Sequence, residues 1–142
     1  MKGSGRPMSS TAELKSVLED SLKNTPILDI HTHLFPPSFE DLCLVGIDEL
    51  LNYHYLVSEL FRHIESDYGR FWGLSRERRA DLVWEKLFLE RSPVSEASKG
   101  VLTVLQTMDL PIARDLDVIR KAFAARDREE YVAQLMERSG VD

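Results

Sequence analysis

The chain has 142 residues, of which 43% are hydrophobic and 30% are charged, a composition that allows one globular domain with a real core. Its formal net charge is −6, and acidic and basic residues are interspersed, which argues against nucleic acid or an anionic membrane surface as a partner. No apolar run approaches the roughly 18 residues of a membrane span. A single cysteine, Cys43, rules out an internal disulfide and favours a reducing compartment, so we expect a cytoplasmic protein.

The amino-terminal part begins with a leader and continues into a helix. Residues 1–10 contain no apolar core that could form a secretory signal, so we expect a flexible leader there. The segment Ser10-Thr11-Ala12-Glu13 has the form of a capping box. Apolar residues then recur at helical spacing, which predicts an amphipathic helix over about 11–23. These residues are Leu14, Val17, Leu18 and Leu22.

A short apolar run that starts at Ile27 predicts a buried β-strand over about 27–31. Side chains two residues apart on a strand point to the same side, so His31 and His33 would converge just beyond its carboxyl end. Two converging imidazoles make half of a metal site. The alternative is that both histidines are hydrogen-bonded structural residues.

The chain from about 47 to 138 carries helical patterns and no second convincing strand. The predicted helices cover 47–51, a stretch around 56–61, 78–89, 94–108, 116–125 and 129–138. Their apolar stripes favour core packing over a cofactor site; the stripe of the fourth comprises Val94, Ala97, Val101, Leu105 and Met108. We interpret the charged run over 76–79 as a solvated helix face, the alternative being a binding patch.

The last residues predict a helix that closes at Gly140, followed by Val141-Asp142, which is typical of a chain entering its next strand. A complete eight-stranded α/β barrel typically takes about 250 residues. One strand, a helical tract and a stop where a second strand should begin therefore predict a fragment of a longer protein.

The segment Asp29-Ile30-His31-Thr32-His33-Leu34 resembles the first-strand signature of the amidohydrolase superfamily, whose members are metal-dependent (β/α)8 barrels. One branch, the uronate (glucuronate) isomerases, carries a helical insertion after strand one and an Asp-His-Tyr motif some two dozen residues beyond the histidine pair. Tyr53-His54-Tyr55 falls at the place of that motif, with Tyr53 in the position of the Asp. The resemblance implies an α/β fold class in which 11–142 is a truncated barrel domain, with strand one at 27–31 and the helical insertion at 47–138.

The resemblance also implies a chemistry for these residues. His31 and His33 become ligands of a divalent metal, expected to be zinc, and His54 and Tyr55 become the residues that contact a sugar acid or transfer its proton. The intact enzyme would interconvert an aldose-type uronate and its ketose isomer. The further metal ligands of the superfamily are not in this sequence, so we expect the fragment alone to be inactive. The expected partner is a small sugar acid, with no nucleic acid and no membrane, and a homo-oligomer stays open.

Two other hypotheses remain open from the sequence. The first is another metal enzyme, either a different metal-dependent hydrolase of the superfamily or a phosphoesterase of the polymerase-and-histidinol-phosphatase type, in which Asp-x-His-Thr-His also occurs. Those phosphoesterases usually continue with a Ser-Asp-Gly-like turn, where this chain has residues 34–37. The second is a non-catalytic helical interaction module with structural histidines. For His54 and Tyr55 the alternative to a site role is an aromatic helix face that packs on the barrel wall.

Overall fold

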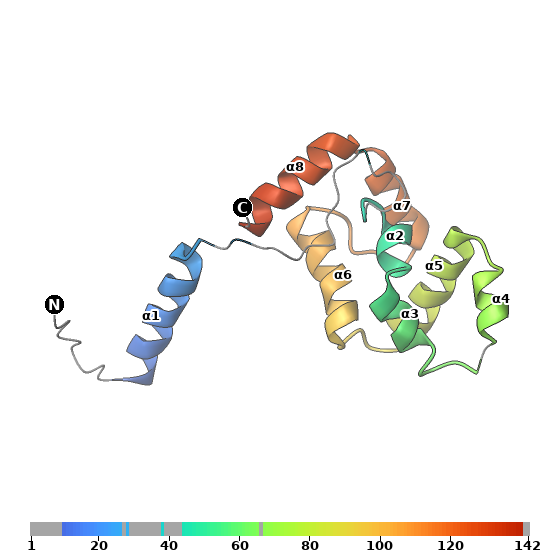
Figure 1. Cartoon of the computed structure of the whole chain (residues 1–142), viewed down its shortest axis with the longest axis horizontal. Coiled ribbons are helices and arrows are strands. Elements are labelled where there is room, and N and C mark those ends of the chain that lie inside the picture. The colour runs from blue at the N-terminus through green and yellow to red at the C-terminus, as the bar shows by residue number, and fades with distance from the viewer. Residues whose placement is uncertain (1–9, 27, 29–37, 39–43, 66, 141–142) are drawn as a thin grey trace.

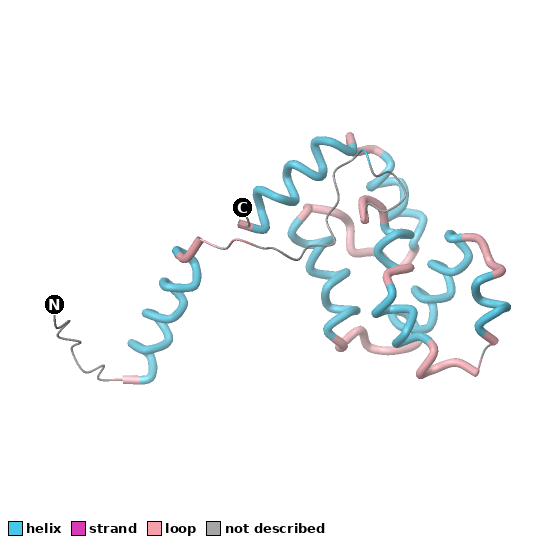
Figure 2. Tube along the Cα trace, viewed as in Figure 1, coloured by secondary structure: helices cyan, strands magenta, loops and turns pink. Residues whose placement is uncertain are grey.

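The computed structural model describes residues 10–26, 28, 38, 44–65 and 67–140. The predicted strand, except for Leu28, lies outside the described residues, as do His31, His33 and Cys43. The elements in the described ranges are helical, with loops between them (Figure 2). They are α1 (Thr11–Asn24), α2 (Ile47–Leu51), α3 (His54–Leu60), α4 (Tyr68–Trp72), α5 (Arg76–Trp84), the π-helical turn η2 (Glu85–Leu89), α6 (Glu96–Thr107), α7 (Leu116–Ala124) and α8 (Arg128–Ser139).

Side-chain caps define where most of the longer helices begin. Ser10 accepts a hydrogen bond from the backbone N–H of Glu13 at 3.2 Å, so the predicted capping residue does cap α1. The same type of cap opens α5, α6, α7 and α8, from Ser75, Ser95, Asp115 and Asp127. At the other end of α8, Gly140 adopts φ of 63°, which confirms the predicted glycine cap.

Helices α2 to α8 form one body around a shared core (Figure 1). In this body α2 packs against α5 and α7, and α3 packs against α5 and α6. Burial of a large aliphatic or aromatic side chain contributes about 1.5–3 kcal/mol, and ten such side chains are at most 2% exposed. They are Ile47, Leu51, Leu56, Leu60, Phe71, Val83, Leu87, Leu105, Met108 and Ile119.

An ion-pair network around Arg120 joins three of these helices. Its guanidinium on α7 donates to Asp48 on α2, at 2.9 and 3.0 Å, and to Asp81 on α5, at 2.7 Å. It also binds Asp117 on its own helix at 2.9 Å, and the backbone carbonyl of Glu77 at 3.3 Å. The Arg120 side chain is only 18% exposed, so its charge is compensated mainly by protein groups.

The structure differs from the predicted helices between 62 and 92 in two ways. Helix α4, which the pattern did not predict, is held by ring contacts: Tyr68 stacks on Phe61 with centroids 4.1 Å apart, and Phe71 is buried. The predicted helix 78–89 begins earlier, at Arg76, and its last turn widens into η2, where the N–H of Glu90 bonds to the carbonyl of Glu85 at 2.9 Å.

One prediction about an apolar stripe, that of α6, was wrong in part. Helix α6 begins at Glu96 because Ser95 caps it, so Val94 precedes the helix and is 70% exposed. Helix α1 forms as expected, yet none of its residues is buried, and in Figure 1 it stands apart from the body of α2 to α8. Its apolar face therefore has no cover among the described residues.

Candidate functional site

The described part of the candidate site is the tripeptide Tyr53-His54-Tyr55, which forms the turn from α2 into α3. Its three rings contact one another, with centroid distances of 4.3 Å for Tyr53 to His54, 4.2 Å for His54 to Tyr55 and 5.4 Å for Tyr53 to Tyr55. His54 is exposed, and Tyr55 is 60% exposed. The rings of His54 and Tyr55 therefore lie at the surface of the described body and not in its core.

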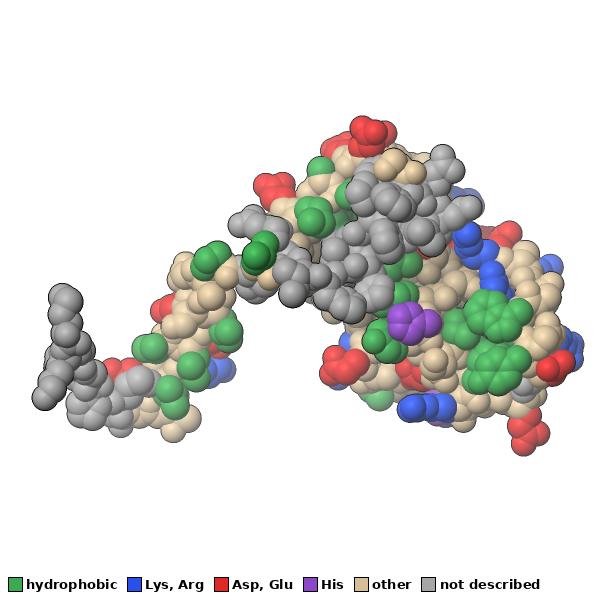
Figure 3. All heavy atoms as spheres, viewed as in Figure 1, with side chains coloured by type: hydrophobic (Ala, Val, Ile, Leu, Met, Phe, Trp, Pro, Cys, Tyr) green, Lys and Arg blue, Asp and Glu red, His purple; other side chains and the backbone are tan. Residues whose placement is uncertain are grey.

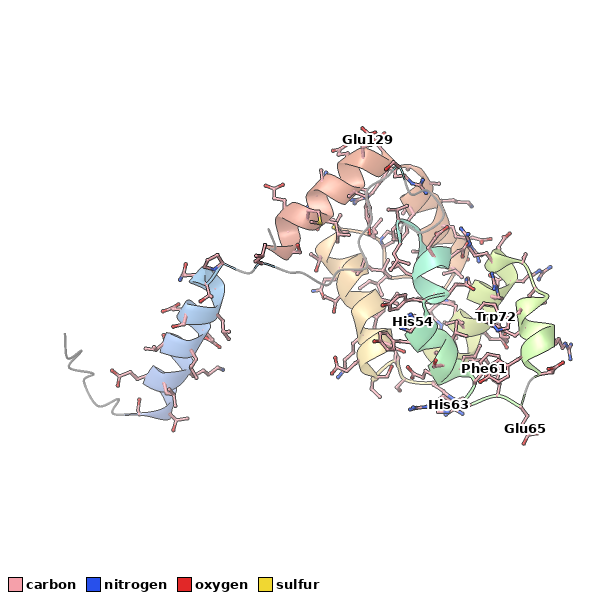
Figure 4. The ribbon with its side chains drawn as sticks, viewed as in Figure 1. His54, Phe61, His63, Glu65, Trp72 and Glu129 are labelled. Carbon is pink, nitrogen blue, oxygen red and sulfur yellow. The ribbon has the colours of Figure 1, made fainter. Side chains whose placement is uncertain are left out.

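Local sequence explains why these rings point outward. The next two residues, Leu56 and Val57, are buried, and Leu60 one turn later is fully buried. A helix with its apolar stripe at these positions turns His54 and Tyr55, in its first turn, away from the buried face. Figure 4 shows His54 at the start of α3 and His63 beyond its other end, so the two described histidines do not converge.

Asn52 holds the turn that carries the rings, and sequence reasoning missed it. Its side-chain amide donates to the carbonyl of Asp48 at 2.8 Å and to the carbonyl of Arg76 at 3.0 Å, so one residue ties the end of α2 to the start of α5. A signal was present, because asparagine between two helical patterns is typical of a cap or turn. The contact with Arg76, 24 residues away, had no signal.

The other end of α3 is fixed by a second polar contact. The hydroxyl of Ser95, which caps α6, donates to the carboxylate of Glu59 at 2.6 Å. The turn that leads into α3 is thus tied to α5, and the far end of α3 is tied to α6. This arrangement gives His54 and Tyr55 a rigid support, which a precise catalytic or binding group requires.

The electrostatic environment of the turn favours a neutral phenol at Tyr53. Burial raises the pKa of Tyr53 above its usual value, and the neighbouring Tyr55 adds to the shift. A phenol that stays protonated can donate a hydrogen bond to a sugar oxygen or carboxylate. The turn therefore offers a hydrogen-bond donor together with aromatic ring faces.

The expected metal site cannot be built from the described residues alone. His31 and His33, the two predicted ligands, lie outside them, and within the described ranges no group of three or more His, Cys, Asp or Glu side chains is placed to hold a metal ion. As a donor set, two imidazoles two residues apart in the sequence fit zinc or a similar divalent ion. None of the described helices is long and apolar enough to cross a bilayer.

Comparison with known proteins connects this geometry to an enzyme. The chain superposes on the crystal structure of a uronate isomerase from Bacillus halodurans C-125 with a TM-score of 0.82 and 45% sequence identity, over 94% of this chain. It spans about a third of that protein, 32% of its length. No protein-family model and no curated protein matches the chain significantly.

A helical body of this structure is thus shared with part of a longer isomerase. The chain is uronate isomerase-like in both sequence and structure. The resemblance inferred from the histidine pair and the Tyr-His-Tyr turn is confirmed. The metal ligands, the site residues and the barrel strand stay predictions.

Proposed function

We propose that this chain provides the amino-terminal part of a metal-dependent uronate isomerase whose (β/α)8 barrel begins with the strand at 27–31. The observation that carries the proposal is the match to a uronate isomerase at 45% identity and a TM-score of 0.82 over 94% of the chain. Neither competing hypothesis has a comparable observation in its favour.

In this proposal the substrate is a sugar acid, and the reaction moves a proton between its two adjacent carbons. His54 and Tyr55 lie next to each other on an exposed and braced turn, so they can bind one face of the sugar acid and relay a proton at its oxygens. Tyr53 packs against both rings and holds them in place. A divalent ion bound by His31 and His33 would polarise the substrate oxygens.

A chimeric enzyme tests the proposal directly. The matching third of the Bacillus halodurans enzyme is replaced by this chain, and conversion of glucuronate to its ketose isomer is measured together with bound zinc. We expect isomerase activity, loss of bound metal in His31→Ala and His33→Ala, and a fall in kcat/KM of about 100-fold or more for His54→Gln. A folded, metal-loaded chimera without isomerase activity would contradict the proposal.

Matched control variants separate site effects from general damage. His63→Gln is the control for His54→Gln, because it changes the same residue type beyond the far end of α3. Tyr68→Phe, at an exposed tyrosine on α4, is the control for the site variant Tyr55→Phe. Neither control should alter kcat/KM by more than about twofold. Equal losses in His54→Gln and His63→Gln would mean that the start of α3 has no special role.

A further inference from the structure

Helix α1 has the features of a helix made to pack against something. It is capped by Ser10, it carries an ion pair between Lys15 and Glu19 at 3.7 Å, and it gathers its aliphatic side chains on one face. These side chains are all exposed: Leu14 by 44%, Val17 by 48%, Leu18 by 53% and Leu22 by 74%.

The body of α2 to α8 does not cover this face. No residue of α1 is buried, and none belongs to the core or to the partly buried side chains packed against it. Isolated helices shorter than about 12–15 residues are marginal in water, and most helical stability in proteins comes from packing of the apolar face. With 14 residues, α1 therefore depends on a packing partner.

The comparison with the Bacillus halodurans enzyme offers a candidate for that partner. The 6% of this chain that the match leaves out amounts to fewer residues than the 14 of α1, so at least part of α1 has an equivalent in that enzyme. That enzyme also contains about two thirds of its length that this chain does not match.

A second copy of the chain fits the face less well. Four half-exposed aliphatic side chains on a helix about 21 Å long present far less than the roughly 800 Å² per partner that a stable interface buries. Within one polypeptide the same small face is sufficient, because the packing partner is already tethered and the association entropy is small.

We propose that the face formed by Leu14, Val17, Leu18 and Leu22 docks onto an apolar surface in the two thirds of the uronate isomerase fold that this chain does not match, and joins the two parts of the enzyme. The choice of partner rests on the proposed function. Helix α1 thus acts as a docking helix, separate from the turn that carries the candidate catalytic residues.

Hydrogen exchange read by mass spectrometry tests the docking. In the isolated chain the α1 amides should exchange nearly as fast as in an unfolded peptide, whereas in the chimera we expect them to be slowed by at least about 100-fold, as burial of two or three leucine side chains implies. Leu18→Glu should abolish this slowing in the chimera. Ser16→Glu, which adds the same charge on the opposite side of α1, should retain it.

The exchange rates of the α1 amides in the isolated chain and in the chimera decide whether α1 docks as proposed. Fast exchange of α1 in both proteins would overturn the docking, and so would slow exchange in the isolated chain, since α1 would then pack on its own body or on a second copy. The measurement is repeated with the unmatched part of the Bacillus enzyme co-expressed as a separate polypeptide, so that it does not depend on the fused chain folding. A chimera that protects α1 but does not isomerise uronate would contradict the proposed function and leave the docking intact.

Discussion

Arg120→Ala should be the most damaging single change of a charged residue in the helical body. The variant removes contacts to carboxylates on α2, α5 and α7 at once. The partly buried contact with Asp48 is worth about 1.5–3 kcal/mol, as is usual for hydrogen bonds between charged groups. The contact with Asp81, which is 41% exposed, adds about 0.2–1 kcal/mol, and the exposed pair with Asp117 adds about 0.3–0.5 kcal/mol.

The expected loss in the free energy of unfolding is therefore about 2–4.5 kcal/mol. Urea denaturation of the isolated chain, followed by circular dichroism at the helix band, measures it. Arg120→Lys keeps the charge but not the planar fork of donors, so it should lose less than the alanine variant. The neighbouring exposed Lys121 provides the control, because Lys121→Ala should stay within about 0.5 kcal/mol of the wild type.

A double-mutant cycle shows whether the network is the cause. Asp48→Asn and Arg120→Ala remove the same contact. The double variant should therefore lose at least about 1 kcal/mol less free energy of unfolding than the two single variants lose together. A stabilising role for the network is refuted if Arg120→Ala unfolds at the same urea concentration as Lys121→Ala. It is also refuted if the losses caused by the changes at 48 and 120 are additive.

Three further predictions concern the same helical body. Burial raises the pKa of Asp48 although Arg120 opposes the shift, so the folded state takes up a proton more readily than the unfolded state. The free energy of unfolding of the wild type, relative to that of Asp48→Asn, should therefore rise as the pH falls from neutral towards about 4. Denaturation curves across that range measure this difference. Gly100→Ala should stabilise the chain by up to about 1 kcal/mol, because an added Cβ in α6 meets no atom within 4 Å; Gly140→Ala, at φ of 63°, should instead cost about 1 kcal/mol, and thermal melts of the two variants should shift in opposite directions. Leu105→Ala removes a fully buried side chain and should lower the free energy of unfolding by about 2–5 kcal/mol, and an unchanged urea midpoint would show that the core is not packed as described.

The sequence predicted most of the helices because the signals for them are local. Apolar spacing located α6 and α7, and Gly140 marked the end of α8 as expected. The five residues of α4 are too few to show a period, and that helix depends on ring contacts such as Tyr68 on Phe61. The widening of the last turn into η2 likewise has no pattern of its own.

For the candidate site too, the sequence predicted local features and missed the tertiary contacts. His54 and Tyr55 could be named from their resemblance to a motif, and their exposure follows from the buried stripe that comes after them. The support behind them could not be predicted, because Asn52 and Glu59 bond to positions 24 and 36 residues away. Such contacts are set by the tertiary arrangement, which periodicity does not report.

The self-contained core of α2 to α8 has a consequence for the order of events during synthesis. Because the buried side chains among the described residues come from within 47–131, this body can fold as soon as its last helix leaves the ribosome, before any polypeptide that follows it has been made. Helix α1 is translated earlier but, if it docks as proposed, it finds its partner only after that later part has been made. The first helix of the chain to be synthesised would then be the last to become buried, and its exposed leucines are where a chaperone would bind in the interval.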